Sequence, residues 1–264
     1  IENSNNTLGE DEEWFKEKGG DFLVSLPLGK HLRIDAMYTL KEVTDEYREY
    51  PGAPFKKYQQ GAIGGSLVWD NVVYQEIGPI SGAQFNIHGD FGEKKLGSDF
   101  YYRNYEGELR GYANYNFNNL WKYGKRLVFA MRLKGGYKKD DVLVFPLGGQ
   151  DSLRGYGYHE FHGTRLALGN LELRYPLFEI NHVVLPMDLF LAKRLAFAIF
   201  GDAGRVWNTG RLKPKDAEAS VGAGLRFLMF MFGKIPLYHN FEISKSVTDS
   251  DRGARGFLSF GTMF

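Results

Sequence analysis

Apolar and polar residues alternate with a period of two through most of the chain from about residue 21 onward. Because successive side chains of a strand point to opposite faces, this period predicts strands whose two faces meet different surroundings. In the segment 164–176, for example, Leu171 and Leu173 alternate with Asn170, Glu172 and Arg174. Eleven such segments are found, at 21–28, 31–43, 59–70, 80–91, 103–117, 125–137, 164–176, 194–207, 218–231, 237–247 and 254–264.

The length of these segments narrows the fold class. Many run for 11 to 15 residues, whereas strands of soluble proteins are mostly ~5–6 residues long. Strands of ~9–11 residues or more, apolar outside and polar inside, are typical of barrels that cross a membrane. We therefore predict an all-β fold, a transmembrane antiparallel up-and-down β-barrel. A soluble β-sandwich or barrel also alternates and is the alternative.

The strand count raises a question of closure. Hydrocarbon offers no hydrogen-bond partner, so a sheet in a membrane has to close on itself. With eleven strands of alternating direction, the first and the last would run parallel, but an up-and-down barrel closes antiparallel with an even number of strands. We expect a twelve-stranded barrel, or the latter part of a larger one. The missing strand would lie cryptically in the acidic segment 1–20 or upstream of Ile1, and residues 21–264 would form the barrel.

Composition excludes several classes of protein. The 33 Lys and Arg nearly balance the 32 Asp and Glu, and without a basic excess we expect no nucleic-acid partner. The chain has no cysteine, so disulfides and thiolate metal sites are excluded. The best apolar run, 225–232, is interrupted by Arg226 and falls far short of the ~18 residues of a membrane-spanning helix.

The longest connection, 138–163, carries the stretch "GGQDSLRGY". Counting strand directions back from a C-terminal strand that runs toward the periplasm places this loop on the outer side. A loop of this length without regular structure is usually mobile or functional. Glu172 and Asp202 lie on the polar faces of the next two segments, and a guanidinium suits bidentate pairing with carboxylates. We predict that the loop folds into the lumen and that Arg154 pairs with both acids.

Three stretches, in the order "GGQDSLRGY", "GNLELRYPL" and "FGDAGRVW", resemble motifs of the BamA/TamA superfamily of outer-membrane assembly factors, also called the bacterial surface antigen family. The resemblance covers roughly residues 21–264. It implies a sixteen-stranded barrel with a weak seam between its first and last strands. Arg154 would anchor the loop, Gly155 and Tyr156 would shape its tip, and Glu172 and Asp202 would be the lumen partners.

The resemblance also implies a function and a location. The protein would insert or translocate other proteins at the bacterial outer membrane. Its partners would be outer-membrane lipid and lipopolysaccharide, client or partner outer-membrane proteins, and periplasmic accessory proteins. The sequence departs from the family pattern because it shows no periplasmic POTRA repeats and has room for about the last eleven family strands.

The C-terminal segment points to the same location. Leu258, Phe260 and Phe264 share one face of the last predicted strand. A final aromatic residue of this kind resembles the signal by which outer-membrane barrels are recognised for assembly.

Enzymatic motifs are not found. The sequence has no G-x-S-x-G, no H-E-x-x-H and no phosphate-binding glycine loop, so we expect neither an enzyme nor a cofactor. The cluster "HEFHG" at 159–163 is interpreted as a solvated loop rather than a metal site. Mixed charge on the inner face leaves a porin-like solute channel as one alternative. A barrel that anchors an upstream domain, such as a patatin-like lipase, is another.

Overall fold

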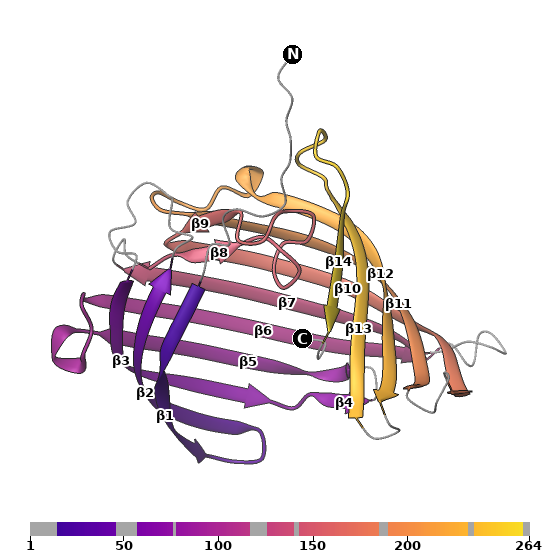
Figure 1. Cartoon of the computed structure of the whole chain (residues 1–264), viewed down its shortest axis with the longest axis horizontal. Coiled ribbons are helices and arrows are strands. Elements are labelled where there is room, and N and C mark those ends of the chain that lie inside the picture. The colour runs from indigo at the N-terminus through magenta and orange to yellow at the C-terminus, as the bar shows by residue number, and fades with distance from the viewer. Residues whose placement is uncertain are drawn as a thin grey trace.

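The computed structural model describes residues 15–45, 57–75, 78–116, 126–139, 143–184, 190–231 and 235–260. Nearly all of them belong to a single antiparallel sheet whose long strands follow one another in chain order (Figure 1). These strands are β1 (Phe15–Pro27), β2 (Leu32–Asp45), β3 (Lys57–Asp70), β5 (Gly78–Gly92), β6 (Tyr102–Asn116), β7 (Arg126–Lys139), β10 (Arg165–Val184), β11 (Phe190–Trp207), β12 (Glu218–Met231), β13 (Ile235–Ser246) and β14 (Arg255–Phe260).

Each of the eleven predicted segments coincides with one of these strands, so the all-β, antiparallel, up-and-down class is confirmed. Three short strands are additional: β4 (Val73–Gln75) pairs with β5, and β8 (Phe145–Leu147) pairs with β9 (Phe161–Gly163). In the part of the chain that the structure describes, two short 3-10 helices, η1 (Lys94–Leu96) and η3 (Pro214–Asp216), lie in connections. No helix in the described residues is long and apolar enough to cross a membrane.

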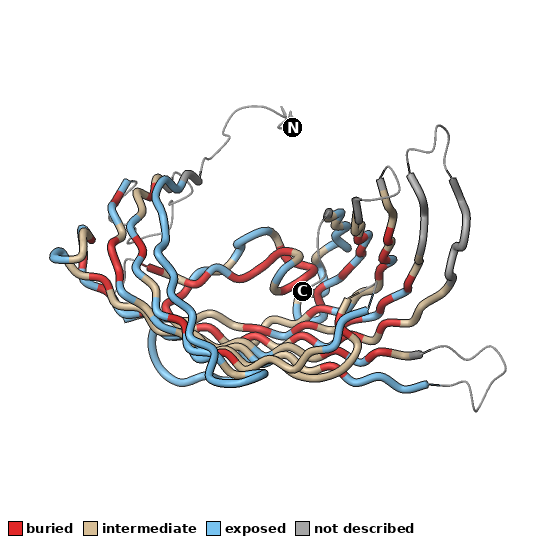
Figure 2. Tube along the Cα trace, turned by 90° about the horizontal axis from the view of Figure 1, so that it is seen from below, coloured by how far each residue is buried: buried red, intermediate tan, exposed pale blue. Residues whose placement is uncertain are grey.

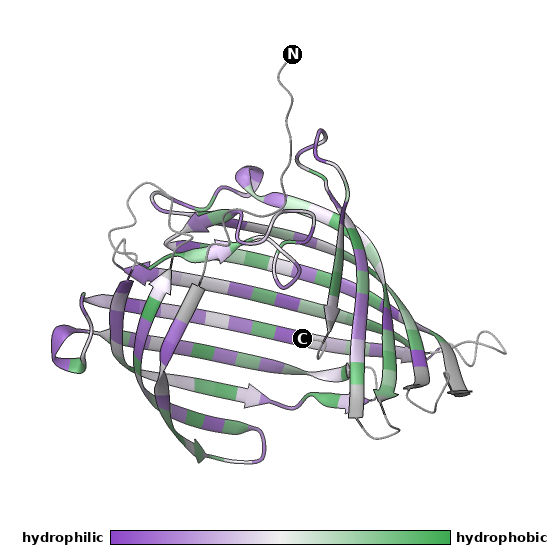
Figure 3. Cartoon of the chain, in the orientation of Figure 1, coloured by the Kyte–Doolittle hydropathy of each residue, from purple (hydrophilic) through white to green (hydrophobic). Residues whose placement is uncertain are grey.

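Hydrophilic and hydrophobic residues alternate along the strands (Figure 3), and the exposure of their side chains shows that the two faces of the sheet differ as predicted. Large apolar side chains on one face stay exposed, among them Leu171 at 49 % and Ile243 at 59 %. On the other face Glu172 and Asp202 are buried at 2 % and 3 % exposure. A soluble protein buries apolar groups and exposes charges, so this reversed arrangement is expected for a sheet with lipid outside and polar groups inside.

The sheet is strongly curved, and the long loop lies inside the trough that it forms (Figure 2). In the described residues β1 pairs with β2 alone and β14 with β13 alone, so these strands form the two edges. Since every neighbouring pair is antiparallel, β1 and β14 run in the same direction. Antiparallel closure between these edges would need a further strand, and the closed barrel of twelve or more strands stays a prediction.

Two expectations about local structure are corrected. The stretch 138–163 is not devoid of regular structure, because β7 extends to Lys139 and β8 and β9 form a small ladder inside it. The N-terminal boundary at residue 21 is also too late. β1 begins at Phe15, which pairs with Asp45 at the end of β2. Residues 15–20 therefore lengthen the strand predicted at 21–28 instead of forming a separate strand. Residues 1–14 lie outside the described residues.

Candidate functional site

The connection between β7 and β10 turns onto the concave face of the sheet (Figure 2). Its Arg154 contacts acids of β10, β11 and β13. Its base packs through an apolar cluster in which Leu147, Leu153 and Tyr156 of the loop meet Leu166 and Leu168 of β10. Leu153 is 0 % exposed and Arg154 is 1 % exposed. The apolar residues beside Arg154 therefore dock the loop, and the guanidinium is drawn out of water with them.

Asp202 of β11 is the main partner of Arg154. The Nε and Nη2 atoms of Arg154 donate to Asp202 Oδ2 and Oδ1 at 2.8 Å and 2.7 Å, and the backbone N–H of Arg154 donates to Oδ2 at 3.2 Å. This is a bidentate pair, which fixes the direction of the guanidinium as well as its position. Asn170 of β10 donates to Asp202 Oδ1 at 2.8 Å and to the Ser152 carbonyl at 2.7 Å, which ties the acid to the loop backbone.

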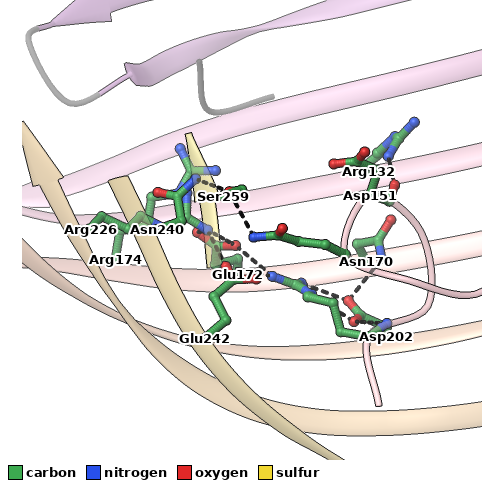
Figure 4. Close-up of polar contacts among 12 residues, drawn as sticks. Arg132, Asp151, Asn170, Glu172, Arg174, Asp202, Arg226, Asn240, Glu242 and Ser259 are labelled. Carbon is green, nitrogen blue, oxygen red and sulfur yellow. Dashed lines mark hydrogen bonds and ion pairs between the residues drawn. The ribbon is translucent and has the colours of Figure 1, made fainter. Parts of the chain in front are cut away.

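The rest of the site is a buried charge cluster on the inner wall (Figure 4). Arg154 Nη1 lies 3.4 Å from Glu172 and 3.3 Å from Glu242. Glu172 also accepts from Arg174 at 2.6 Å and from Arg226 at 2.6 Å. The cluster thus holds three guanidinium groups and three carboxylates, all at most 6 % exposed. They come from the loop and from β10, β11, β12 and β13.

The face of the Arg154 guanidinium is covered by an aromatic ring. Its central carbon lies 3.4 Å from the centroid of Phe200, two residues before Asp202 on the same face of β11. Burial alone would lower the pKa of Arg154, but the hydrogen bonds and charge of Asp202, together with Glu242 and Glu172, raise it above its usual value. The guanidinium therefore remains charged, with carboxylates at its edge and a ring on its face.

Gly155 and Tyr156 form the tip of the loop against β12 and β13. Gly155 has φ of +94°, and a Cβ built there would lie 3.0 Å from Ser220 Cβ, so glycine suits the position in both conformation and space. The Tyr156 hydroxyl lies 2.7 Å from Glu218 Oε2, 2.7 Å from Ser246 Oγ and 2.6 Å from Thr248 Oγ1. The ring of Tyr156 thus belongs to the apolar cluster, and its hydroxyl fixes the tip to β12 and to the end of β13.

Further contacts join the loop to β7, on one side of the charge cluster, and to β14, on the other. Arg132 of β7 donates to the Asp151 carbonyl at 2.8 Å, and Gln150 donates to Ser259 of β14 at 2.8 Å. Arg252, in the connection between β13 and β14, binds both oxygens of Glu160 at 2.7 Å and 2.9 Å. The loop therefore bridges from β7 to the last strand of the sheet.

Sequence reasoning brought Arg154, Glu172 and Asp202 together, and the structure places these three in contact. It did not assign Glu242, Arg174 or Arg226 to this site. Their inward positions were readable from the alternation. The strand register that brings them within one cluster was not.

Comparison with known proteins decides the family. The family model for the Omp85 superfamily domain matches residues 16–259. The chain belongs to the Omp85 superfamily. Among solved structures, it is similar to BamA from Haemophilus ducreyi lacking POTRA domains 1–3, with a TM-score of 0.62 and 18 % sequence identity. That similarity covers 94 % of this chain and 55 % of the BamA chain, so this chain spans about half the length of that structure. No curated protein matches the chain.

The Omp85 match confirms the resemblance carried by the three motifs, each of which supplies part of the cluster. "GGQDSLRGY" brings Arg154, "GNLELRYPL" brings Asn170, Glu172 and Arg174, and "FGDAGRVW" brings Phe200 and Asp202. Membership of this superfamily implies an outer-membrane barrel protein. At 18 % identity, the likeness to BamA supports the fold and not a particular activity.

The C-terminal signal residues are described in part. Leu258 is 54 % exposed on the outer face, since it pairs with Phe241, which is also exposed. The side chain of Phe260 and the whole of Phe264 lie outside the described residues. The role of these three residues as an assembly signal stays a prediction.

One other constellation on the inner wall contains the residue types of a hydrolase triad. Ser66 Oγ lies 2.9 Å from His88 Nδ1, and His88 Nε2 lies 3.0 Å from Asp90 Oδ1. Ser66 sits in the middle of β3, paired with both β2 and β5. In such a central strand every backbone N–H belongs to the ladder, so β3 has no donor left to stabilise an oxyanion beside the serine. We interpret these residues as a structural hydrogen-bond chain.

Proposed function

We propose that this Omp85 barrel takes part in inserting or translocating proteins at the bacterial outer membrane. The observation that carries the proposal is the buried contact of Arg154 with Asp202, Glu172 and Glu242, in a chain whose residues 16–259 match the Omp85 domain. The partners proposed are client outer-membrane proteins and the surrounding lipid, with periplasmic accessory proteins.

The physical role proposed for the cluster is to hold the loop and the β10–β13 wall as one body. A loop tied by apolar contacts alone could shift along the wall, whereas a bidentate ion pair has one geometry. The contact of Gln150 with Ser259 extends this body to β14. A client strand that pairs with a sheet edge requires an edge held in a defined position, because backbone pairing is specific to register.

The experiment uses the full-length protein in vesicles of outer-membrane lipid and a denatured outer-membrane β-barrel as client. We expect vesicles with the wild-type protein to accelerate formation of the protease-resistant client over empty vesicles. Arg154→Ala should reduce that acceleration. Arg103→Ala is the matched control, because Arg103 is exposed on β6 and contacts Tyr101 rather than the cluster.

A solute channel is the competing function, favoured by inner-face ion pairs such as Arg132 with Glu108 at 2.9 Å and Lys134 with Glu106 at 3.1 Å. Planar-bilayer recordings on the same preparation separate the two. Steady conductance together with no acceleration of client folding would contradict the assembly proposal and support the channel. If neither activity occurs, the remaining hypothesis is a barrel that anchors an upstream domain.

A further inference from the structure

An apolar groove of about 640 Å3 crosses the outer, lipid-facing side of the sheet, away from the arginine cluster. It lies over β6, β7, β10 and β11, and part of the β11–β12 connection covers it through Leu212, Pro214 and Ala217. Leu109 and Leu133, both exposed, form one wall. The floor consists of small residues: Gly107, Gly135, Ala167, Gly169 and Ala203.

The strand register explains how small residues from four strands form one floor. Gly107 of β6 pairs with Gly135 of β7, which in turn pairs with Ala167 of β10. In the adjacent row Gly169 of β10 pairs with Ala203 of β11. Directly paired residues of neighbouring strands share a face, so the small positions adjoin and leave a continuous hollow.

Neither backbone conformation nor close packing requires glycine at the two central positions. A Cβ at Gly107 would meet nothing within 4 Å, and one at Gly135 would meet only the Leu166 carbonyl at 3.8 Å. Neither glycine has a positive φ. Glycine weakens a strand and here has no turn or bulge to make. What these residues provide is the empty space itself.

The next row of paired residues, toward the extracellular end of the strands, indicates the level in the membrane at which the groove lies. In that row Tyr105 pairs with Tyr137, Tyr137 with Arg165, and Arg165 with Trp207. The Arg165 guanidinium also lies 5.5 Å from the centre of the Tyr137 ring. Tyrosine, tryptophan and arginine gather where acyl chains give way to headgroups. The groove therefore lies at the level of the acyl chains just below the headgroups.

The connection above the groove is positively charged. Arg165 donates to the Gly210 carbonyl, and Arg205 donates to Asp216 and to the Lys213 carbonyl, which fixes the connection onto the outer face. Asp216 is the one acid between residues 208 and 217, and it forms an ion pair with Arg205. Three further cations of this connection are exposed at headgroup level: Arg211, Lys213 and Lys215.

We propose that this groove is a binding site for an anionic phospholipid of the surrounding membrane, a lipid whose phosphorylated headgroup carries a net negative charge. One acyl chain lies along the small-residue floor between Leu133 and Leu212, and the phosphate is bound by the cations of the β11–β12 connection. Charge complementarity selects the occupant, because an apolar hollow beneath a cluster of cations fits an anionic headgroup on a hydrocarbon chain. The proposal does not depend on the assembly function, since it concerns binding and the opposite face of the sheet.

Native mass spectrometry of the full-length protein tests it, with phosphatidylglycerol and phosphatidylcholine of equal chain length as the two probes. We expect the wild type to retain phosphatidylglycerol in preference to phosphatidylcholine. Gly107→Leu/Gly135→Leu fills the floor from open positions and should reduce retention of both lipids. Gly111→Leu is the matched control on the same face of β6, where a Cβ would meet only the end of Met131 at 3.8 Å.

A second variant leaves the sheet untouched. Arg211→Gln/Lys213→Gln/Lys215→Gln changes three exposed side chains and should lower the preference for phosphatidylglycerol by at least about fivefold, the change that corresponds to ~1 kcal/mol for a single cation near a lipid surface. Equal retention of the two lipids by the wild type would overturn the proposal. So would retention that the glycine variant leaves unchanged, or a preference that the cation variant leaves unchanged.

Discussion

Arg154 of the loop and Asp202 of β11 form a bidentate pair, with Nε–Oδ2 and Nη2–Oδ1 distances of 2.8 Å and 2.7 Å, at a point where both residues are buried. They are 48 positions apart in the chain. Because Asp202 also receives the backbone N–H of Arg154 and the amide of Asn170, the pair specifies one position of the loop against the wall.

Replacing Arg154 should release the loop. Arg154→Ala leaves Asp202 without its charged partner, and breaking a buried pair in this way costs about 3–5 kcal/mol at most. Arg154→Lys keeps the charge but loses the planar fork and the contact with Phe200, so we expect an intermediate effect. The measurement is cleavage of the loop by protease added to intact vesicles. Cleavage rates equal to those of the wild type in both variants, with Arg103→Ala as reference, would count against the anchor.

The conformation at Gly155 should be intolerant of a side chain. Gly155→Ala introduces a Cβ at positive φ and within 3.0–3.2 Å of Ser220, Lys245 and Ser246, so we expect a loss of about 1–3 kcal/mol. Gly157→Ala is the control, since its φ is not positive and the three atoms nearest to its Cβ belong to side chains, the first being Glu160 Oε2 at 3.1 Å. Unfolding of both variants in urea, followed by loss of heat-modifiable migration, compares them. Equal midpoints would show that the tip is not constrained.

The contribution of the cluster's charge balance to stability can be measured separately from that of a single ion pair. Glu242→Gln removes one of three carboxylates and leaves Arg226 and Arg154 short of compensation, a loss we place at about 3–5 kcal/mol if the cluster is dry. The double variant Arg226→Met/Glu242→Met removes one charge of each sign, so its loss should be smaller than that of Glu242→Gln. The check is a urea unfolding series on the wild type, Glu242→Gln, the single variants Arg226→Met and Glu242→Met, and the double variant. Strict additivity would indicate that these two residues act independently.

The anchoring of the β11–β12 connection should weaken in acid. The hydrogen bond from Arg205, reinforced by the charges of Arg205, Lys215 and Lys213, holds the pKa of Asp216 below its usual value. A depressed pKa means that this contact is fully formed above the ordinary pKa of about 4 and is lost as the pH falls through the folded-state value. Hydrogen exchange of residues 208–217, corrected for intrinsic rates, should therefore rise in acid. In Asp216→Asn, residues 208–217 should exchange rapidly both in acid and above the ordinary pKa of Asp216. If exchange in the wild type does not change in acid, Asp216 does not anchor this connection.

The local pattern of the sequence was enough to predict every long strand and its two faces. Alternation is a property of neighbouring residues, so Glu172 and Asp202 could be placed on the inner wall without knowledge of the fold. Spacing of the same kind also indicated that Arg154 lies in a long connection between two strands, and the motifs around it suggested its partners.

Tertiary structure decided the rest. Whether Glu242 or Arg226 reaches Glu172 depends on the register of four strands, and a shift of one residue in any of them would turn those side chains outward. Other contacts also join distant segments. They are the β8–β9 ladder, the hydrogen bonds of Tyr156 with Ser246 and Thr248, and the pairing of Gly135 with Gly107 and Ala167. Such contacts arise from the way curved strands bring remote residues together, and the period of the sequence carries no information about that alignment.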